Sequence, residues 1–238
     1  IFRDDSVTPD YFPVYYNTWF HPFGHEVKKV NAKGSIGHRF EYIIHDLEED
    51  YSLLGPSTYG VNWEESLLLK ETAEDAFGDI LPVKWKMNGL QAVPTQDIIH
   101  LMGLENFIYA MYDYPELVKE MMMRLADDYI IFFNWLRTEK LLLPTASDEF
   151  LNQGTYCFTQ ELPAQPSQIA LKDVWGYLDS QESSSISPDM YGEFIFPSYQ
   201  KIAGVFGLLS YGCCEPVHSI WEQYLSKLEN LRNVSISA

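Results

Sequence analysis

Residues 171–212 read LKDVWGYLDSQESSSISPDMYGEFIFPSYQKIAGVFGLLSYG. Two short apolar runs in this stretch, 171–180 and 205–212, contain β-branched and aromatic residues and predict strands. Between them, Ser187 is a suitable helix N-cap and Pro188 suits the first turn of a helix. A strand, a helix and another strand in this order are typical of a parallel sheet that is covered by helices.

The same alternation continues along the chain, where we expect a helix over 217–228 and a strand over 233–237. A Rossmann domain would show a glycine-rich G-x-G-x-x-G turn after its first strand, and the sequence contains none. The sequence therefore favours an α/β fold of the (β/α)8 barrel (TIM barrel) type, as one domain over residues 1–238. Because the chain begins at Ile1 and stops inside an apolar alternating run, we expect a barrel that is incomplete at both ends.

Helical patterns dominate the chain before the first of these strands. Apolar residues recur at helical spacing after Pro115, which predicts a long amphipathic helix up to residue 138. Pro197 is expected to bend or split the later helix that Ser187 begins. The other expected elements are strands at 13–20 and 80–87, helices at 41–54 and 64–77, a helix capped by Thr95 that runs to Met102, and a mostly irregular stretch at 141–166.

The composition excludes several classes of protein. The formal net charge is −18, and no basic run is longer than Lys28-Lys29, which argues against nucleic-acid binding. No stretch reaches the roughly 18 apolar residues that a membrane span needs, and no signal peptide is visible. The three cysteines, Cys157, Cys213 and Cys214, are too few for a disulfide framework. We therefore expect a cytoplasmic protein with reduced thiols and no association with membranes.

Four side chains that suit a metal or a catalytic site follow the strand predicted at 205–212. Cys213, Cys214, Glu215 and His218 lie between this strand and the next helix. In α/β barrels the catalytic residues lie at the carboxyl ends of strands. Thiolate, carboxylate and imidazole groups all bind zinc, although one short turn cannot direct all four inward. The alternative interpretation is a pair of small thiols that pack beside a helix.

Other polar side chains also fall at predicted strand ends. His21 and His25 follow the first predicted strand and could form a substrate-binding or acid–base pair, or only satisfy backbone groups. Two presumed strand ends carry acids, which could face the mouth of a barrel or be simply solvated, and aromatic residues beside the second could form the wall of a flat pocket or belong to the core. These residues are Asp148, Glu149, Asp179, Glu182, Trp175 and Tyr177.

Four segments together resemble the uroporphyrinogen decarboxylase superfamily. They are FGDILPVKW (77–85), MGLENFIYAMYDYPELVKEMMMRL (102–125), WGYLDSQESSSISPDMYGEFIFPSYQKI (175–202) and SYGCCEP (210–216). The resemblance runs from about residue 40 to the end, and it implies a (β/α)8 barrel of that type. It also implies one of two chemistries, which are decarboxylation of a tetrapyrrole without a cofactor and zinc-dependent methyl transfer between a corrinoid protein and a thiol, or a related demethylation.

The resemblance to the decarboxylases lacks one expected feature. Those enzymes hold their carboxylate substrate with an arginine-rich motif after the first strand, whereas residues 13–25 contain no arginine. In the methyltransferases an H-x-C-G motif ends a strand and holds zinc. Cys213 takes the position of the motif cysteine, and Tyr211 replaces the histidine.

The resemblance therefore favours metal-assisted methyl transfer or demethylation with a corrinoid-linked partner. A tetrapyrrole decarboxylase and a non-catalytic tetrapyrrole- or corrinoid-binding module remain the alternatives. An exposed sheet edge also predicts self-association into a homo-oligomer. The expected catalytic residues are Cys213, Glu215, His21 and Asp179, the expected substrate-binding residues are His25, Tyr211, Trp175, Asp148 and Glu182, and the expected zinc ligands are Cys213, Cys214 and His218.

Overall fold

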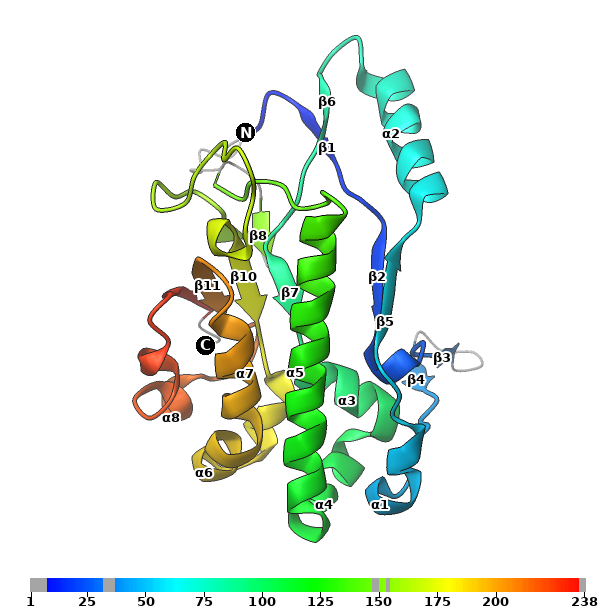
Figure 1. Ribbon diagram of the computed structural model, residues 1–238, viewed down its shortest axis with the longest axis vertical. Coiled ribbons are helices and arrows are strands. Elements are labelled where there is room, and N and C mark those ends of the chain that lie inside the picture. Colours follow the sequence, from blue (N-terminus) through cyan, green and yellow to red (C-terminus); the bar gives the residue numbers. More distant parts are fainter. Residues whose placement is uncertain (1–7, 32–36, 147–149, 153–154, 236–238) are drawn as a thin grey trace.

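A computed structural model describes residues 8–31, 37–146, 150–152 and 155–235. The main sheet contains four parallel strands in the order β12-β11-β10-β7. Helices cover one face of this sheet, which gives the mixed α/β layering that the strand–helix alternation predicts (Figure 1). These four strands are β7 (Leu90–Ala92), β10 (Trp175–Leu178), β11 (Leu208–Tyr211) and β12 (Leu231–Val234).

The first predicted strand is divided into two. Its first part, β1 (Phe12–Val14), pairs in parallel with β6 (Val83–Trp85), which leads into β7. Its second part, β2 (Thr18–His21), leaves the parallel arrangement and pairs in antiparallel fashion with β5 (Thr58–Val61). Phe20 of β2 stacks on Tyr129 at 4.4 Å between ring centroids, so aromatic side chains occupy the space between β2 and the helix layer.

The parallel strands follow one another in chain order. β1 lies beside β6, β6 continues into β7, and β7, β10, β11 and β12 are then neighbours in sequence order. A doubly wound sheet would instead reverse its order at a switch point. The described residues nevertheless form an open sheet, and they do not show the closed barrel that the sequence predicts.

The remaining elements surround this sheet. The helices are α1 (Leu47–Asp50), α2 (Trp63–Phe77), α3 (Pro94–Met102), α4 (Leu104–Asp113), α5 (Pro115–Thr138), α6 (Pro188–Met190), α7 (Phe196–Ala203) and α8 (His218–Trp221). Short 3-10 turns are η1 (Pro22–Gly24), η2 (Tyr51–Leu53), η3 (Leu171–Asp173), η4 (Gln181–Ser185) and η6 (Leu225–Lys227), and η5 (Tyr191–Ile195) is a π-helical turn. The minor strands are β3 (Lys29–Asn31), β4 (His38–Phe40), β8 (Phe150–Asn152) and β9 (Thr155–Tyr156).

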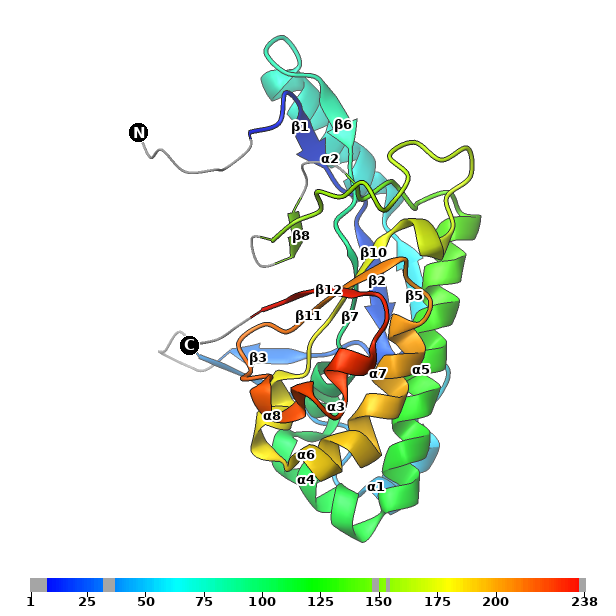
Figure 2. The same ribbon diagram turned by 90° about the vertical axis from the view of Figure 1, so that its left-hand side faces the viewer.

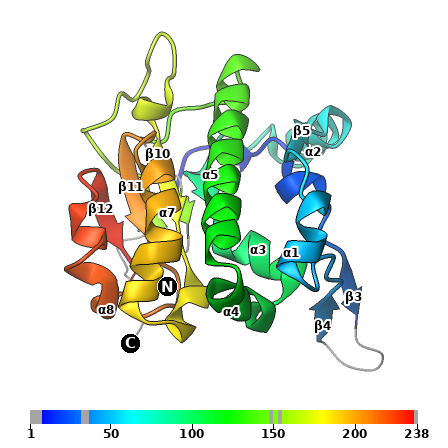
Figure 3. The ribbon, with the colours of Figure 1, turned by 60° about the horizontal axis from the view of Figure 1, so that its bottom comes forward.

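The long helix α5 forms the centre of the core, and its predicted bounds are confirmed. It lies beside α7 along one face of the sheet (Figures 2 and 3). Its apolar stripe is buried, as the helical spacing predicts. The buried residues are Val118, Met121, Met122, Leu125, Ala126, Tyr129, Phe132, Phe133 and Leu136.

The helix that begins at Pro188 is interrupted, as its proline predicts. Ser187 caps it by accepting a hydrogen bond from the Met190 backbone N–H at 3.2 Å. Pro197 cannot donate a backbone hydrogen bond, and the turn that precedes it widens to the π-helical η5. The prediction of a split helix is therefore confirmed.

Three local predictions are wrong. The expected helix at 41–54 covers only Leu47–Leu53, because Asp46 caps it by accepting from the backbone N–H groups of Glu48 and Glu49. Thr95 lies inside α3 and does not cap it, since its hydroxyl bonds to Glu182 and not to its own helix. The expected helix at 217–228 is only the short α8 followed by the turn η6.

The two faces of the main sheet differ in character. Leu178, Leu209 and Tyr211 belong to the large apolar cluster under the helices. Trp175 and Leu208 belong to a separate small cluster, which loop residues from 151–162 cover. Because side chains alternate along a strand, Tyr177 and Ser210 share the face of Trp175 and Leu208.

Gly176 provides a test of this packing. We expect Gly176→Ala to lower the free energy of unfolding by about 1–3 kcal/mol, because overpacking a filled core forces neighbours to shift. A Cβ at this position would overlap the ring of Phe206, which is fully buried and cannot move aside. Urea unfolding would measure the difference, with Gly204→Ala as the control because that position has helical dihedral angles and more room. Equal stability of the two variants would contradict this description of the sheet.

Candidate functional site

Two carboxylates meet at the carboxyl ends of β10 and β11. Asp179 follows β10, and Glu215 lies in the turn after β11. The Glu215 side chain accepts from the Ser180 backbone N–H at 3.0 Å and from the Cys213 backbone N–H at 2.8 Å. This carboxylate therefore joins the segments that follow the two strands, and both of its oxygens are occupied.

Asp179 is the more unusual of the two acids. Its side chain is only 5% exposed, and the Tyr177 hydroxyl donates to its Oδ2 at 2.9 Å. Its other oxygen, Oδ1, is buried and has no hydrogen-bond partner in the described part of the chain. Burial, together with Glu215 and Glu182, raises the pKa of Asp179 to about 6. A buried acceptor without a donor costs free energy, so this atom needs an explanation.

Two further acids extend the group toward α3. The Thr95 hydroxyl donates to Glu182 Oε2 at 2.7 Å and lies 2.9 Å from the Tyr199 hydroxyl, which donates to the Asp179 carbonyl. In the same helix, Asp97 accepts from the Tyr129 hydroxyl at 2.5 Å. Burial is the main cause that raises the pKa of Asp97 to about 7, and the charge of Glu182 adds to it.

The charge of each of these acids affects the pKa of the acid next to it in space. Asp97 responds to Glu182, and Asp179 responds to Glu182 on one side and to Glu215 on the other. We call Asp97, Glu182, Asp179 and Glu215 the acidic row. In the ranges that the structure describes, no lysine or arginine forms an ion pair with a member of this row.

Cys213 and Cys214 lie beside the row. Their sulfur atoms are 3.4 Å apart, with Cys213 partly exposed and Cys214 exposed. Burial is the first cause that raises the pKa of Cys213 to about 11, followed by Cys214 and by the charges of Asp179 and Glu215. The Cys213 thiol is therefore less acidic than an ordinary cysteine thiol.

The residues expected to bind zinc do not fit a zinc site. His218 is exposed in the first turn of α8, and both oxygens of Glu215 already accept backbone hydrogen bonds. Within the described ranges, no group of three or more His, Cys, Asp or Glu side chains could hold a metal ion. The donor set therefore supports no step through a metal.

Two expected substrate-binding residues face other parts of the molecule. Tyr211 is fully buried under the helices, and its hydroxyl lies 3.0 Å from that of Tyr191 in η5. Trp175 lies at the other end of β10 from Asp179, and its indole N–H donates to the Cys157 carbonyl at 3.2 Å. Both residues therefore contribute to the core and not to the acidic row.

The two histidines also lie apart from the row. His21 ends β2 and packs against Trp19, and His25 Nε2 lies 2.8 Å from the Leu53 carbonyl oxygen. β2 and β5 lie on the other side of α5 from β10 and β11 (Figures 1 and 3). Asp148, the remaining expected substrate-binding residue, and Glu149 beside it lie outside the described residues.

The sequence prediction missed part of the row. Asp97 and Thr95 follow the short strand β7, which the sequence analysis did not predict. β7 has only three residues and is flanked by Gly89 and Pro94, so its apolar pattern is too brief to distinguish from a loop. An acid two residues after a buried threonine is also too common a pattern to indicate a site.

One cavity lies apart from the acidic row. A cavity of about 400 Å³ opens where β2 diverges from β7, and Trp19, Phe20, Lys86, Gln91 and Phe132 are among its lining residues. None of the acidic row lines it. The chemistry of the row and not the size of this cavity therefore indicates the candidate site.

The comparisons with known proteins identify no family. No protein-family model, no curated protein and no solved structure matches this chain. None of the helices in the described ranges has the length and apolar character needed to cross a membrane.

Proposed function

We propose that this chain forms part of a (β/α)8 barrel of the uroporphyrinogen decarboxylase superfamily. The chain-order arrangement of β1, β6, β7, β10, β11 and β12 supports this proposal, because barrel strands follow one another in sequence order. The segments that carry the resemblance coincide with the strand–helix units at β10, α7 and β11. The acidic row then lies at the carboxyl ends of the strands, where barrel enzymes place their catalytic residues.

Within this superfamily, the proposed activity is removal of a methyl group from a small substrate, with a corrinoid-carrying protein as partner. The observation that carries the proposal is the buried, unpartnered Oδ1 of Asp179, on an acid whose pKa lies near 6. An acid with a pKa close to the working pH is suited to proton transfer. The proposal includes no zinc step, because the described residues do not provide its ligands.

In the proposed reaction, Asp179 gives its proton to the heteroatom that carries the methyl group. The bond from that heteroatom to the methyl carbon breaks, and its electron pair stays with the heteroatom as the new bond to hydrogen is completed. The reduced corrinoid, bound to the partner, supplies the acceptor for the methyl group. Tyr177 holds Oδ2 of Asp179, and Glu215 fixes the backbone at Ser180 and Cys213, so both act as positioning residues.

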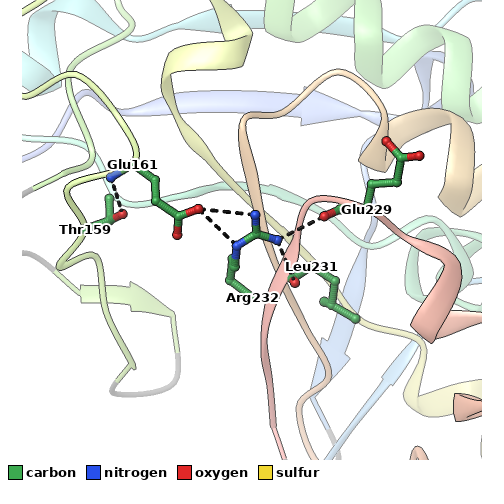
Figure 4. Close-up of polar contacts among 5 residues, drawn as sticks. All are labelled: Thr159, Glu161, Glu229, Leu231 and Arg232. Carbon is green, nitrogen blue, oxygen red and sulfur yellow. Dashed lines mark hydrogen bonds and ion pairs between the residues drawn. The ribbon is translucent and has the colours of Figure 1, made fainter.

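Decarboxylation of a tetrapyrrole receives less support from the same site. A polycarboxylate substrate needs cationic partners, and bidentate binding is best made by arginine. Arg232 of β12 is instead held by Glu161 at 3.2 Å and by the backbone carbonyls of Glu229 and Leu231 (Figure 4). A site that consists of carboxylates would repel such a substrate.

The test is a spectroscopic assay of methyl transfer to free cob(I)alamin, kept reduced with titanium(III) citrate. Methanol, a methoxybenzoate and trimethylammonium serve as donors, and the absorbance change reports methylation of the cobalamin. We expect turnover with at least one donor, and Asp179→Asn to lower its rate about 100-fold, as is typical for loss of a general acid. Asp189→Asn, an exposed acid in α6, is the matched control and should keep the wild-type rate.

Two results would contradict the proposal. One is a wild-type rate in Asp179→Asn, which would remove the acid from the reaction. The other is no transfer from any donor together with binding of a tetrapyrrole, which would favour the non-catalytic module.

A further inference from the structure

We propose that Cys213 and Cys214 form a reversible dithiol–disulfide site, which a small-molecule disulfide oxidises and a small-molecule thiol reduces. The two cysteines follow β11 in the turn that leads to α8. This inference does not depend on the proposed function, because it concerns the two thiols and not the transfer of a methyl group. It follows from the distance between the sulfur atoms, their exposure and the backbone that carries them.

The two sulfur atoms are already in contact. Sγ of Cys213 lies 3.4 Å from Sγ of Cys214, whereas the bond of a disulfide is about 2.05 Å long. The two atoms therefore need to approach only slightly further. The third cysteine, Cys157, is fully buried in the small cluster beside β10, so a reagent in solvent does not reach it in the folded protein.

A reagent in solvent does reach the pair. The side chain of Cys214 is exposed and that of Cys213 is partly exposed. Neither residue belongs to a helix or a strand. The Cys213 N–H donates to the Glu215 carboxylate, and the Cys213 carbonyl accepts from the Ser235 hydroxyl at 2.8 Å. Because side chains hold this backbone, the turn can change its dihedral angles without breaking the pairing of β11.

The reaction consists of two thiol–disulfide exchanges. The Cys214 thiolate attacks one sulfur of the small disulfide, which forms a mixed disulfide and releases one small thiolate. The Cys213 thiolate then attacks the sulfur of Cys214, and the second small thiolate leaves. Two protein thiols are oxidised while one external disulfide is reduced to two thiols, and these products take up the two protons that the cysteines lose.

The environment of Cys213 favours this order of attack. Burial is the first cause that raises the pKa of Cys213, and the hydrogen bond and charge of Cys214 are the next causes. An attacking thiol must be ionised and accessible, so the exposed Cys214 reacts first. Once Cys214 is part of the mixed disulfide it carries no charge, and its contribution to the raised pKa of Cys213 is removed.

A disulfide between neighbouring residues is strained and therefore easily reduced. Adjacent Cα atoms are about 3.8 Å apart across a trans peptide bond, whereas disulfides usually join Cα atoms about 4.4–6.8 Å apart. Strained and exposed disulfides are the labile ones. The pair is therefore suited to a reversible change of state and not to a permanent cross-link.

Closing the bond also changes the contacts of Glu215. One oxygen of this carboxylate accepts from the Cys213 N–H at 2.8 Å, and the other accepts from the Ser180 N–H at 3.0 Å. The backbone between the two cysteines must rotate as the ring closes, and Glu215 is the next residue in the chain. We therefore expect oxidation to weaken the hydrogen bond that joins this turn to the segment after β10.

The experiment treats the folded full chain with mixtures of oxidised and reduced glutathione, traps the remaining thiols with a maleimide under denaturing conditions and measures the intact mass. We expect the wild-type protein to lose two thiols as the oxidised share rises, to keep no glutathione, and to regain both thiols when reduced glutathione is restored. Peptide mapping should place the link between Cys213 and Cys214. Cys213→Ser should instead keep one glutathione on Cys214, because no second thiol displaces it, and Cys157→Ser should behave as the wild type.

Hydrogen exchange followed by NMR tests the change at Glu215. We expect the Ser180 amide to exchange about tenfold faster in the oxidised protein, because a hydrogen bond to a charged acceptor contributes about 1.5–3 kcal/mol and a tenfold change corresponds to about 1.4 kcal/mol. The amide of Leu125, in the middle of α5, is the matched control and should not change.

Three results would overturn the site: glutathione that persists on the wild-type protein, a disulfide between two chains, or no loss of thiols in excess oxidised glutathione. These measurements use the wild-type protein, so they hold even if a variant does not fold. A link between Cys213 and Cys214 with unchanged exchange at Ser180 would support the site and overturn the expected change at Glu215.

Discussion

Asp97→Asn is expected to be more stable than the wild-type protein at pH 8, by up to about 4 kcal/mol, and equally stable near pH 4. Burial raises the pKa of Asp97 from 3.8 to about 7 in the folded protein. The folded state therefore holds this proton more tightly than the unfolded state does. The stabilisation that this tighter proton binding gives is complete below pH 4 and is lost as the pH rises toward 7.

Asparagine has the same shape and never ionises, so the variant avoids this loss. Its carbonyl oxygen can still accept from the Tyr129 hydroxyl. Because Asp97 keeps some contact with solvent, the stated gain is an upper value. Urea unfolding at pH 4, 6 and 8 would measure the gain, with Asp10→Asn at an exposed position as the control. A stability difference that does not change with pH would contradict the raised pKa of Asp97.

Leu125→Ala is expected to lower the free energy of unfolding by about 3 kcal/mol, within the range of about 2–5 that large-to-small core substitutions show. Leu125 is fully buried on α5, which packs against α3, α4, α7 and η5. Removing its side-chain atoms loses apolar burial and leaves a cavity that rigid neighbours fill only in part.

Ile131→Ala is the matched control for this prediction. Ile131 lies on the same helix, but its side chain is 53% exposed, so the substitution should change stability by less than about 1 kcal/mol. Both variants would be unfolded in urea and by heat under the same conditions. Similar losses in the two would mean that the apolar stripe does not determine which face of α5 is buried.

Local signals were sufficient where one element decides its own structure. The spacing from Val118 to Leu136 predicted α5, because a stripe at 3.6-residue spacing can be buried only by a helix. Ser187 and Pro188 predicted the start of α6, and Pro197 predicted the widened turn that precedes α7. Asn62 and Gly78 cap the two ends of α2, close to the ends that the sequence predicts.

The candidate site was predictable only in part. Asp179, Glu182, Glu215 and Cys213 follow predicted strands, and the structure brings them close together. Tyr211 was misplaced because its direction depends on register. It is paired with Leu178 and Val234 on the face that the helices cover, and a strand pattern alone does not say which face that is.

The sequence by itself determined that a strand, a helical segment and a strand follow one another from β10 to β11, because both strands are too apolar to be exposed to solvent and the segment between them has apolar residues at helical spacing. Only the tertiary structure decided that Asp97 and Thr95, far away in the chain, complete a row with Asp179 and Glu215. The reason is physical. Periodicity acts over a few residues, whereas the pKa of an acid and the partner of each oxygen depend on every segment that packs around it.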